Sequence, residues 1–363
     1  ELLENIDRVP DLDPELKKRY IGEAKVLRAY NYYELYTKFG DVPYTTKVLS
    51  IKESMSIART AKATVIANVL ADLDEVINGN YLPTSYDADN KGRITRWAAM
   101  AIKAKIYLFE GNWTQVKNIT STIMTEGGFK LFGSYAGLFE IANEYNSEVI
   151  LDAQYRPTSR EHQMMYVFLP PTLGGYSQLS PLQELVDSYI MLDGKTIKET
   201  GTSFDESHPY ANRDPRLKAT VMYTGNSYTL ADGTEVVINC EKGEGKDGYG
   251  VGSDCSATGY YIKKYWDNTY RATLYSGLNP ILIRYADILL MNAEALAELG
   301  ELDKTAWDAT IKPIRDRAGF TLASALEFPE GASKDKLIEI VRNERRSELA
   351  LEGHRHKDII RWR

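Results

Sequence analysis

The sequence contains no long uninterrupted apolar run. Its most apolar stretches, such as ADILLMNAEALA, carry acidic residues at helical intervals. A membrane-spanning helix needs about twenty predominantly apolar residues, so a transmembrane helix is excluded. The first residues, ELLENIDRVP, lack the character of a signal peptide, and the chain stops abruptly at IIRWR. We therefore expect a processed or incomplete copy, in which a missing export signal says nothing about compartment.

An excess of positive charge is also missing. The chain has 44 Lys and Arg against 51 Asp and Glu, which gives a formal net charge of −7, and its basic clusters are short. Nucleic-acid binding relies on a basic face that neutralises phosphates, so we expect no such partner. The 43% of apolar residues are enough for the core of one large domain or two ordinary ones.

Cysteine is nearly absent. The two residues, Cys240 and Cys255, flank the glycine-rich loop EKGEGKDGYGVGSD. Their spacing permits a disulfide, and two free thiols are the alternative. No histidine lies in the same segment, which argues against a cysteine nucleophile.

Histidine is scarce, and its densest cluster lies in ERRSELALEGHRHKD near the end of the chain. Glu344, Glu348 and Glu352 recur every four residues and share a helical face, whereas His354 and His356 are two apart, a spacing that suits a strand. Neither H-E-x-x-H nor a Glu three residues before a His is present. We predict no metal and no cofactor. We predict instead a network of buried carboxylates and arginines, drawn from Arg315, Arg317, Arg345, Arg346, Arg355 and Arg361.

The segment YDADNKGRI partly matches a calcium loop. Asp87 and Asp89 occupy its first and third positions, but Lys91 stands at the fifth and Ala98 at the twelfth, where an acid is required. We interpret the segment as a polar loop that enters a helix near Arg93, with calcium as the less favoured alternative.

Asp287 and Glu294 could be drawn as the acid pair of a glycosidase. They are two helical turns apart, and no aromatic platform flanks them. Salt bridges to Arg284 and to the arginines of IRDRAGF are the favoured interpretation.

Repeated helix pairs predict a mainly α fold. Small, aromatic and glycine positions of the tetratricopeptide pattern recur in AKIYLFEGNWTQV, in AEALAELGELDKTAWDA and, with a second helix delayed by Pro43, in NYYELYTKFGDVPY. The glycines that end the first helix of each pair are Gly111, Gly300 and Gly40, and Gly353 closes a possible fourth unit. We interpret these repeats as a scaffold.

The pattern changes between the helical parts. EVILDAQY and KATVMYT are predicted strands, and SYTLADGTEVVI is a predicted hairpin that turns at Asp232-Gly233. We therefore divide the chain into a helical half at 1–131, a loop-rich insertion with short strands at 132–282 and C-terminal helices at 283–363, together one globular unit.

Tyrosine is abundant, with 25 residues, many of them in the loops of the insertion. A tyrosine ring offers an apolar face and a polar tip, which suits a wet recognition surface, although about half of these rings are expected to pack helices.

Seven segments, spread in order through most of the chain, carry a resemblance to a known family. They are EAKVLRAYNYYELYTKFGDVPY, GRITRWAAMAIKAKIYLFEGNW, NRDPRL, TGYYIKKYWD, IRYADILLMNAEALAELG, IRDRAGF and ERRSELALEGHR. Through these segments the sequence resembles the SusD/RagB family of outer-membrane glycan-binding lipoproteins from Bacteroidetes. The resemblance implies a tetratricopeptide-like scaffold with an irregular glycan-binding surface. It also implies a lipid anchor outside this sequence, on the cell-surface face of the outer membrane, and a SusC-type TonB-dependent barrel as partner.

A non-catalytic glycan-binding protein is therefore the leading hypothesis. Such a site stacks aromatic rings on sugar faces and reaches hydroxyls with amides and acids. The candidate residues come from the long loops, and they are Trp266, Asn268, Tyr270, Tyr261, Tyr249, Tyr176 and Gln178. A tetratricopeptide adaptor that binds a protein is the second hypothesis, and a glycoside hydrolase is the third.

Overall fold

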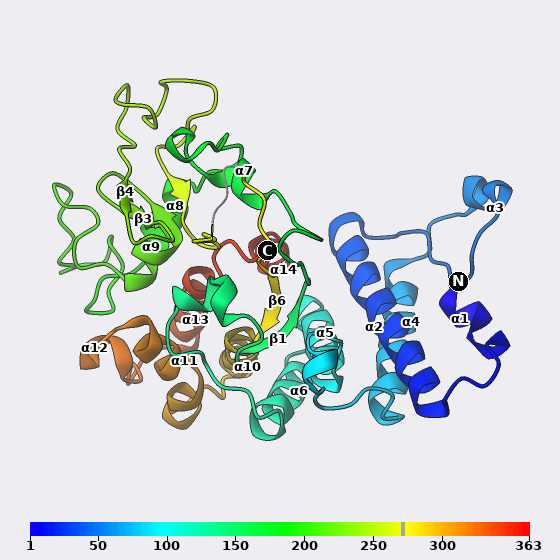
Figure 1. Cartoon of the computed structure of the whole chain (residues 1–363). Coiled ribbons are helices and arrows are strands. Elements are labelled where there is room, and N and C mark those ends of the chain that lie inside the picture. Colours follow the sequence, from blue (N-terminus) through cyan, green and yellow to red (C-terminus); the bar gives the residue numbers. More distant parts are fainter. Residues whose placement is uncertain (270–272) are drawn as a thin grey trace. The chain divides into compact units, whose positions relative to one another are not determined.

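The computed structural model describes residues 1–269 and 273–363, which form two compact units (Figure 1). Unit 1 comprises Glu1–Gly128 and His356–Arg363, and unit 2 comprises Phe129–Arg355. The division at 131 and 282 that the sequence predicts stays a prediction. In the part of the chain that the structure describes, helices fall short of the length and apolarity that crossing a bilayer demands.

Unit 1 is built from paired helices. α2 (Pro14–Phe39) packs against α4 (Lys62–Asn78), α4 against α5 (Arg96–Phe109), and α5 against α6 (Trp113–Glu126) (Figure 1). Side-chain caps from Asp13, Thr95 and Asn112 begin α2, α5 and α6. The helix pair predicted from AKIYLFEGNWTQV is confirmed. The unit NYYELYTKFGDVPY was predicted to have a second helix delayed by Pro43, and this delay after α2 is confirmed as well.

Short elements complete unit 1, and the segment predicted as a polar loop is one of them. The Asp87 carboxylate accepts a hydrogen bond from the Asn90 amide and begins a single 3-10 turn. Within residues 1–269 and 273–363, no group of three or more His, Cys, Asp or Glu is placed to hold a metal ion. The short elements are α1 (Leu2–Asn5), η1 (Ile6–Arg8), α3 (Ile51–Ser56) and η2 (Ala88–Asn90).

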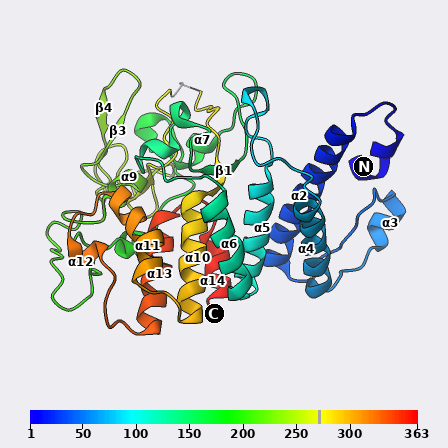
Figure 2. The same ribbon diagram turned by 90° about the horizontal axis from the view of Figure 1, so that it is seen from below.

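A helical base forms the C-terminal part of unit 2. The buried helix α10 (Tyr285–Leu299) packs against both α11 (Lys304–Ala318) and α13 (Lys334–Glu348), and Figure 2 shows the three side by side. Gly300 ends α10 in the left-handed conformation with φ 74°, where glycine avoids the penalty of a side chain. The second predicted repeat is thereby confirmed. The other helices here are α12 (Ala323–Leu326) and α14 (Arg355–Arg361), whose residues from His356 onward belong to unit 1.

Small antiparallel sheets and long loops make up the rest of unit 2. β1 (Val149–Asp152) pairs with β6 (Ile281–Arg284), and β3 (Ser227–Thr229) pairs with β4 (Glu235–Val237). The predicted strand in EVILDAQY and the predicted hairpin are confirmed, with Gly233 in the left-handed conformation at the turn.

The strand predicted over KATVMYT is mostly wrong. Helix α9 (Pro215–Thr220) occupies its first half, because Asp214 caps the helix and Pro215 stands at its first position. Only β2 (Val221–Met222) remains extended, and it pairs with β5 (Tyr261–Ile262). The remaining elements are η3 (Gly137–Phe139), η4 (Ile141–Asn143), α7 (Met164–Phe168), η5 (Pro171–Leu173) and α8 (Gln183–Ser188).

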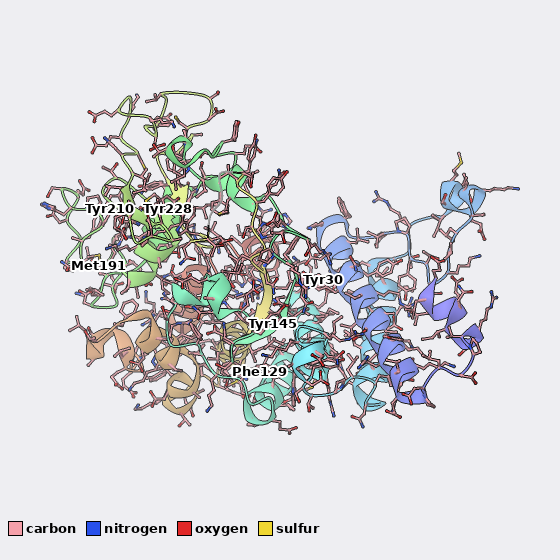
Figure 3. All side chains as sticks on the ribbon, viewed as in Figure 1. Tyr30, Phe129, Tyr145, Met191, Tyr210 and Tyr228 are labelled. Atoms are coloured by element: carbon pink, nitrogen blue, oxygen red, sulfur yellow. The ribbon has the colours of Figure 1, made fainter. Side chains whose placement is uncertain are left out.

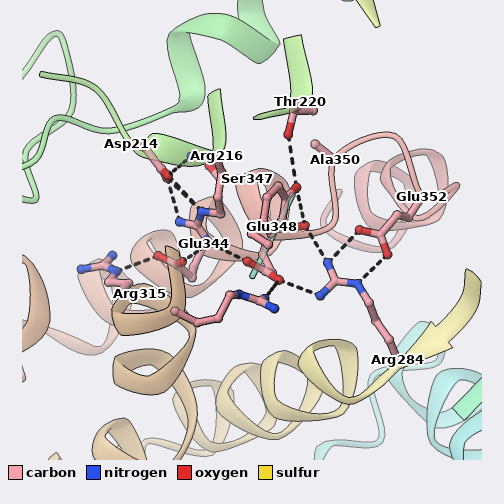
Figure 4. A network of polar contacts seen from close by, with 12 residues as sticks. Asp214, Arg216, Thr220, Arg284, Arg315, Glu344, Ser347, Glu348, Ala350 and Glu352 are labelled. Atoms are coloured by element: carbon pink, nitrogen blue, oxygen red, sulfur yellow. Dashed lines mark hydrogen bonds and ion pairs between the residues drawn. The ribbon is translucent and has the colours of Figure 1, made fainter. Parts of the chain in front are cut away.

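A buried ion network joins the loops of unit 2 to this helical base (Figure 4). At its centre the Glu348 carboxylate accepts hydrogen bonds from Arg284 at 2.6 Å and from Arg216 at 2.8 Å, and it also pairs with Arg317. Arg284 reaches Glu148 and Glu352 as well, both at 2.7 Å. The Arg216, Arg284 and Glu348 side chains are at most 1% exposed. Burial alone would raise the pKa of Glu348, but the charges of the arginines hold it below its usual range.

The predicted pairing of carboxylates with arginines is confirmed for Arg315 and Arg317, which bind Glu344 and Glu348. The suggested pairing of Asp287 with Arg284 needs correction. Asp287 accepts a hydrogen bond from Arg345 at 2.6 Å, whereas Arg284 is directed from the end of β6 toward α13.

Lys264 joins the same network from the loop that follows β5. Its ammonium donates to the Tyr135 hydroxyl at 2.9 Å, to the Ala350 carbonyl at 2.8 Å and to the Glu352 carboxylate at 2.6 Å. The loop therefore has a rigid anchor immediately before Tyr265 and Trp266.

Candidate functional site

Trp266 and Tyr261, two of the predicted site residues, belong to one buried apolar cluster of unit 2. Trp266 is 9% exposed, and its indole nitrogen donates to the Thr229 carbonyl at 2.8 Å. Its ring meets the edge of Tyr228, which Figure 3 labels in the loop-rich part of unit 2. Tyr261 is 0% exposed and leaves no ring surface for a ligand in this structure. Its hydroxyl donates to the Asp247 carbonyl at 2.6 Å. Tyr270 lies outside the described residues.

Tyr176 lies at the surface and stacks on Tyr166 of α7. The ring centroids are 4.3 Å apart, the planes are 29° from parallel, and Tyr176 is 38% exposed. The backbone amide of Tyr176 donates to the Tyr166 carbonyl at 2.9 Å, which holds the loop on α7. Ser177 adopts the left-handed conformation with φ 42°, and the exposed Gln178 follows it. A stacked aromatic platform with an adjacent amide results.

Tyr275 is a further exposed ring on a neighbouring segment. An isolated antiparallel bridge joins His162 to Ser276, so Tyr275 lies beside the segment that enters α7. Tyr275 is 40% exposed. The hydrogen bond between Tyr166 and Tyr176, together with burial, raises the pKa of Tyr166. The backbone of Leu274 is left-handed, with φ 58°, and its side chain is buried.

Tyr155 lies on the other side of His162. Its ring meets the imidazole edge-to-face, with centroids 4.7 Å apart, and the Arg160 guanidinium lies 5.7 Å from the Tyr155 centroid. We call Tyr166, Tyr176 and the adjacent Gln178 the tyrosine surface. The sequence pointed to Tyr176 and Gln178 but not to Tyr166, because nothing local predicts which ring stacks on Tyr176.

Tyr249 is 41% exposed and lies on the glycine-rich loop. This loop is tied to the segment before Tyr176, because the Thr172 amide donates to the Asp247 carboxylate at 2.8 Å. Cys240 and Cys255 are free thiols, and burial raises the pKa of Cys240 to about 12. The disulfide left open by the sequence is not formed in this structure.

A cavity of about 450 Å³ lies beside Trp266. Its apolar wall includes Phe139, Tyr265 and Trp266, and the exposed Asn268 lies at its rim. The predicted residues Trp266 and Asn268 therefore both line this cavity, whereas Tyr176 does not. We call this the lysine–aromatic cavity, because its polar lining includes Lys218, Lys263, Lys264, Glu140 and Thr229.

The acid pair considered for a glycosidase is inaccessible. Asp287 and Glu294 are each 0% exposed in α10. Asp287 is paired with Arg345, and the Glu294 carboxylate lies 3.9 Å from the Arg342 guanidinium. Neither carboxylate can reach a substrate as the protein is folded here, because both are sealed in the helical base.

Comparison with known proteins gives consistent matches over nearly the whole chain. It is 28% identical to SusD-like protein P25 of Formosa agariphila over 99% of this chain and 67% of that protein, so it spans about two thirds of this relative's length. A SusD-like carbohydrate-binding protein from Bacteroides fragilis matches with a TM-score of 0.86 and 29% identity, over 97% of this chain and 68% of that one. A laminarin-binding SusD-like protein matches with a TM-score of 0.70 and 25% identity, over 99% and 74%.

Family patterns match both parts of the chain. Residues 1–108 match a family described as starch-binding and associating with the outer membrane. The pattern of the SusD family matches residues 138–363, which is more than half of the chain. The resemblance found in the sequence is thereby confirmed, and with it the mainly helical, tetratricopeptide-like fold. The chain belongs to the SusD family.

Proposed function

We propose that this protein binds glycans without cleaving them, on the tyrosine surface of unit 2. The observation that carries the proposal is the exposed Tyr176 ring, fixed by stacking on Tyr166 and flanked by Gln178. Sugar rings present apolar faces to such a platform and hydroxyls to a neighbouring amide. The carbohydrate-binding and laminarin-binding relatives support the same class of ligand.

Membership of the family supports a proposal for the cellular role. We propose that the protein is held by a lipid anchor on the cell-surface face of the outer membrane. There it captures oligosaccharide and delivers it to a SusC-type TonB-dependent barrel for import. The family description that matches residues 1–108, which names association with the outer membrane, supports this location. Co-purification of the full-length protein with such a barrel from native membranes tests the partnership.

Substitution of Tyr176 by Ala tests the binding surface. We expect affinity for a bound glycan, chosen from a panel that includes laminarin, to fall roughly tenfold, because an aromatic anchor is lost. The melting temperature should stay close to that of the parent protein, since the ring is 38% exposed. Titration calorimetry and a melting curve measure the two effects.

Tyr249→Ala is the matched control, because Tyr249 is equally exposed and lies on a different loop. Its affinity should be unchanged, and a loss there with none in Tyr176→Ala would move the site to the glycine-rich loop. Release of reducing ends from any polysaccharide would refute binding without cleavage. Nanomolar binding of a peptide, with no glycan bound, would favour the adaptor hypothesis instead.

A further inference from the structure

Lys218 and Lys263 line the lysine–aromatic cavity from different elements. Lys218 lies in the last turn of α9, and Lys263 directly follows β5. The Lys263 ammonium donates to the neutral side-chain oxygen of Asn226 at 3.1 Å. Over residues 1–269 and 273–363, neither lysine has a carboxylate within ion-pair distance. Lys264 differs, because its ammonium is bound in the buried ion network.

The charges around the two lysines leave room for an anion. Burial and the neighbouring charge of Lys218 lower the pKa of Lys263, so the two ammonium groups repel each other. Glu235 offsets part of this charge, because hydrogen bonds from the hydroxyls of Ser227 and Thr229 help to keep its carboxylate ionised, but it is one negative charge beside two lysines. Glu140 also lines the cavity, and burial raises the pKa of its carboxyl group. An anion between the lysines would replace repulsion with two charge-assisted contacts.

The rest of the lining suits a sugar better than a bare inorganic ion. Phe139, Tyr265 and Trp266 provide an apolar wall, and Asn268 provides an exposed amide. The volume of about 450 Å³ lies within the range of small-molecule sites, roughly 300 to 1,000 Å³. Tyr265 holds its left-handed backbone, with φ 63°, next to Trp266. Strained backbone of this kind persists where the surroundings fix it and gathers at binding sites.

We infer that this cavity binds an acidic sugar residue, with its carboxylate or sulfate between Lys218 and Lys263 and its ring against the aromatic wall. The inference rests on the proposed glycan binding and adds the charge class of the ligand. Asn268 and Glu140 are placed to reach ring hydroxyls. The protein would thus prefer uronate-containing or sulfated oligosaccharides to neutral ones.

Titration calorimetry with matched probes tests the preference. Tetragalacturonate, its methyl ester, a sulfated carrageenan tetrasaccharide and laminaritetraose are compared at one salt concentration. We expect at least one anionic probe to bind roughly tenfold or more tightly than the methyl ester and the neutral tetrasaccharide, since charged hydrogen bonds discriminate by this much. Which anionic probe wins distinguishes carboxylate from sulfate.

The double variant Lys218→Gln, Lys263→Gln should lose that preference and keep its affinity for laminaritetraose. Lys242→Gln, which removes one positive charge from the exposed glycine-rich loop, should keep both. Equal affinities for the anionic and neutral probes in the parent protein would overturn the inference, and so would a preference that survives the double variant.

The neutral probe separates the two proposals. Laminaritetraose binding that is weakened by Tyr176→Ala, with no anionic preference, leaves the proposed function standing and rejects the acidic site. The absence of binding to every probe rejects both. Melting curves of the double variant and of a Lys263→Arg variant show whether a lost preference reflects lost charge, because Lys263→Arg retains the charge and should retain the preference.

Discussion

Single residues of unit 2 are held in unusual backbone conformations beside the candidate binding groups. Ser177 precedes Gln178, Leu274 precedes Tyr275 and Tyr265 precedes Trp266, and all three have positive φ. A residue other than glycine is uncommon in this region and costs on the order of 1–3 kcal/mol. Buried neighbours hold these conformations, because Leu274 and Tyr265 are at most 7% exposed. The side chains of Gln178, Tyr275 and Trp266 are therefore directed by residues whose own side chains are buried.

Trp266 is the residue whose role is most sharply tested. Trp266→Ala should destabilise unit 2 by about 3–5 kcal/mol, because it removes a buried ring and leaves the Thr229 carbonyl without its indole donor. Calorimetric unfolding measures the loss. Trp266→Phe, which keeps a ring in the cluster, should cost clearly less. An unchanged melting temperature for Trp266→Ala would show that the ring does not belong to the core.

The sequence separated exposed aromatic residues from buried ones only in part. Tyr176 and Gln178 lie at the surface as a binding role requires, but Tyr261 from an equally tyrosine-rich loop is fully buried. Composition identifies loops rich in rings, and the pairing of β2 with β5 decides which ring turns inward. Lys218 and Lys263 gave no local signal, because the cavity that joins them is formed by distant segments.

At the scale of elements, the last turns of α13 and the turn that follows it organise unit 2 by presenting Glu344, Glu348 and Glu352 to cations from other segments. The four-residue spacing predicted one helical face for all three glutamates, but α13 ends at Glu348, so Glu352 lies in the turn beyond the helix. Arg216 and Lys264, which pair with these glutamates, were not predictable, since they lie far away in the sequence. The same holds for Glu148, which shares Arg284 with them. Helix boundaries were more accessible to prediction, because capping residues and glycines act locally. The Asp214-Pro215 pair was such a local signal for the start of α9. It was overlooked because KATVMYT, which overlaps the end of that helix, has the pattern of a strand.

Glu348→Ala should destabilise unit 2 by roughly 3 kcal/mol or more, because Arg216, Arg284 and Arg317 would lose a shared buried partner. Glu339→Ala is the control on the same helix, since the Glu339 side chain is 64% exposed, and its effect should be close to zero. Urea unfolding compares the two variants. Equal effects would contradict the network's role, and stoichiometric zinc or iron that is lost with Glu348 would restore a metal site.

The same network predicts the response to acid. The pKa values of Glu344, Glu348 and Glu352 lie below the ordinary value of 4.5 despite burial, because arginines and Lys264 favour the charged forms. Their contribution to stability is therefore complete above pH 4.5 and is lost as the pH falls through the lower values of the folded state. We expect the parent protein to lose stability below pH 4.5 more steeply than Glu348→Gln does. Urea midpoints measured across this range provide the check.

At the scale of the whole molecule, tyrosine sets the alkaline limit. Burial raises the pKa of Tyr33, Tyr189, Tyr228 and Tyr265 well above the ordinary value of 10.0. A raised pKa contributes stability that is complete below pH 10 and is lost as the pH rises further. Phenolate absorbance should therefore rise in two stages, first from exposed rings and then together with the loss of helical circular dichroism. A single smooth titration with helix retained would contradict this burial.

The central position of Glu348 also determines when unit 2 can fold during synthesis. Arg216 and Arg284 leave the ribosome well before Glu348 does, and both are buried once unit 2 is complete. Until α13 has been synthesised, these cations lack the counter-charge that they share, and only Asp214 and Glu148 offset the cost of burying them. The loops of unit 2 must therefore wait for the synthesis of α13 before they close. A nascent or truncated chain that stops before Glu348 is expected to remain open to proteases and chaperones, so this protein is poorly suited to domain-by-domain folding during synthesis.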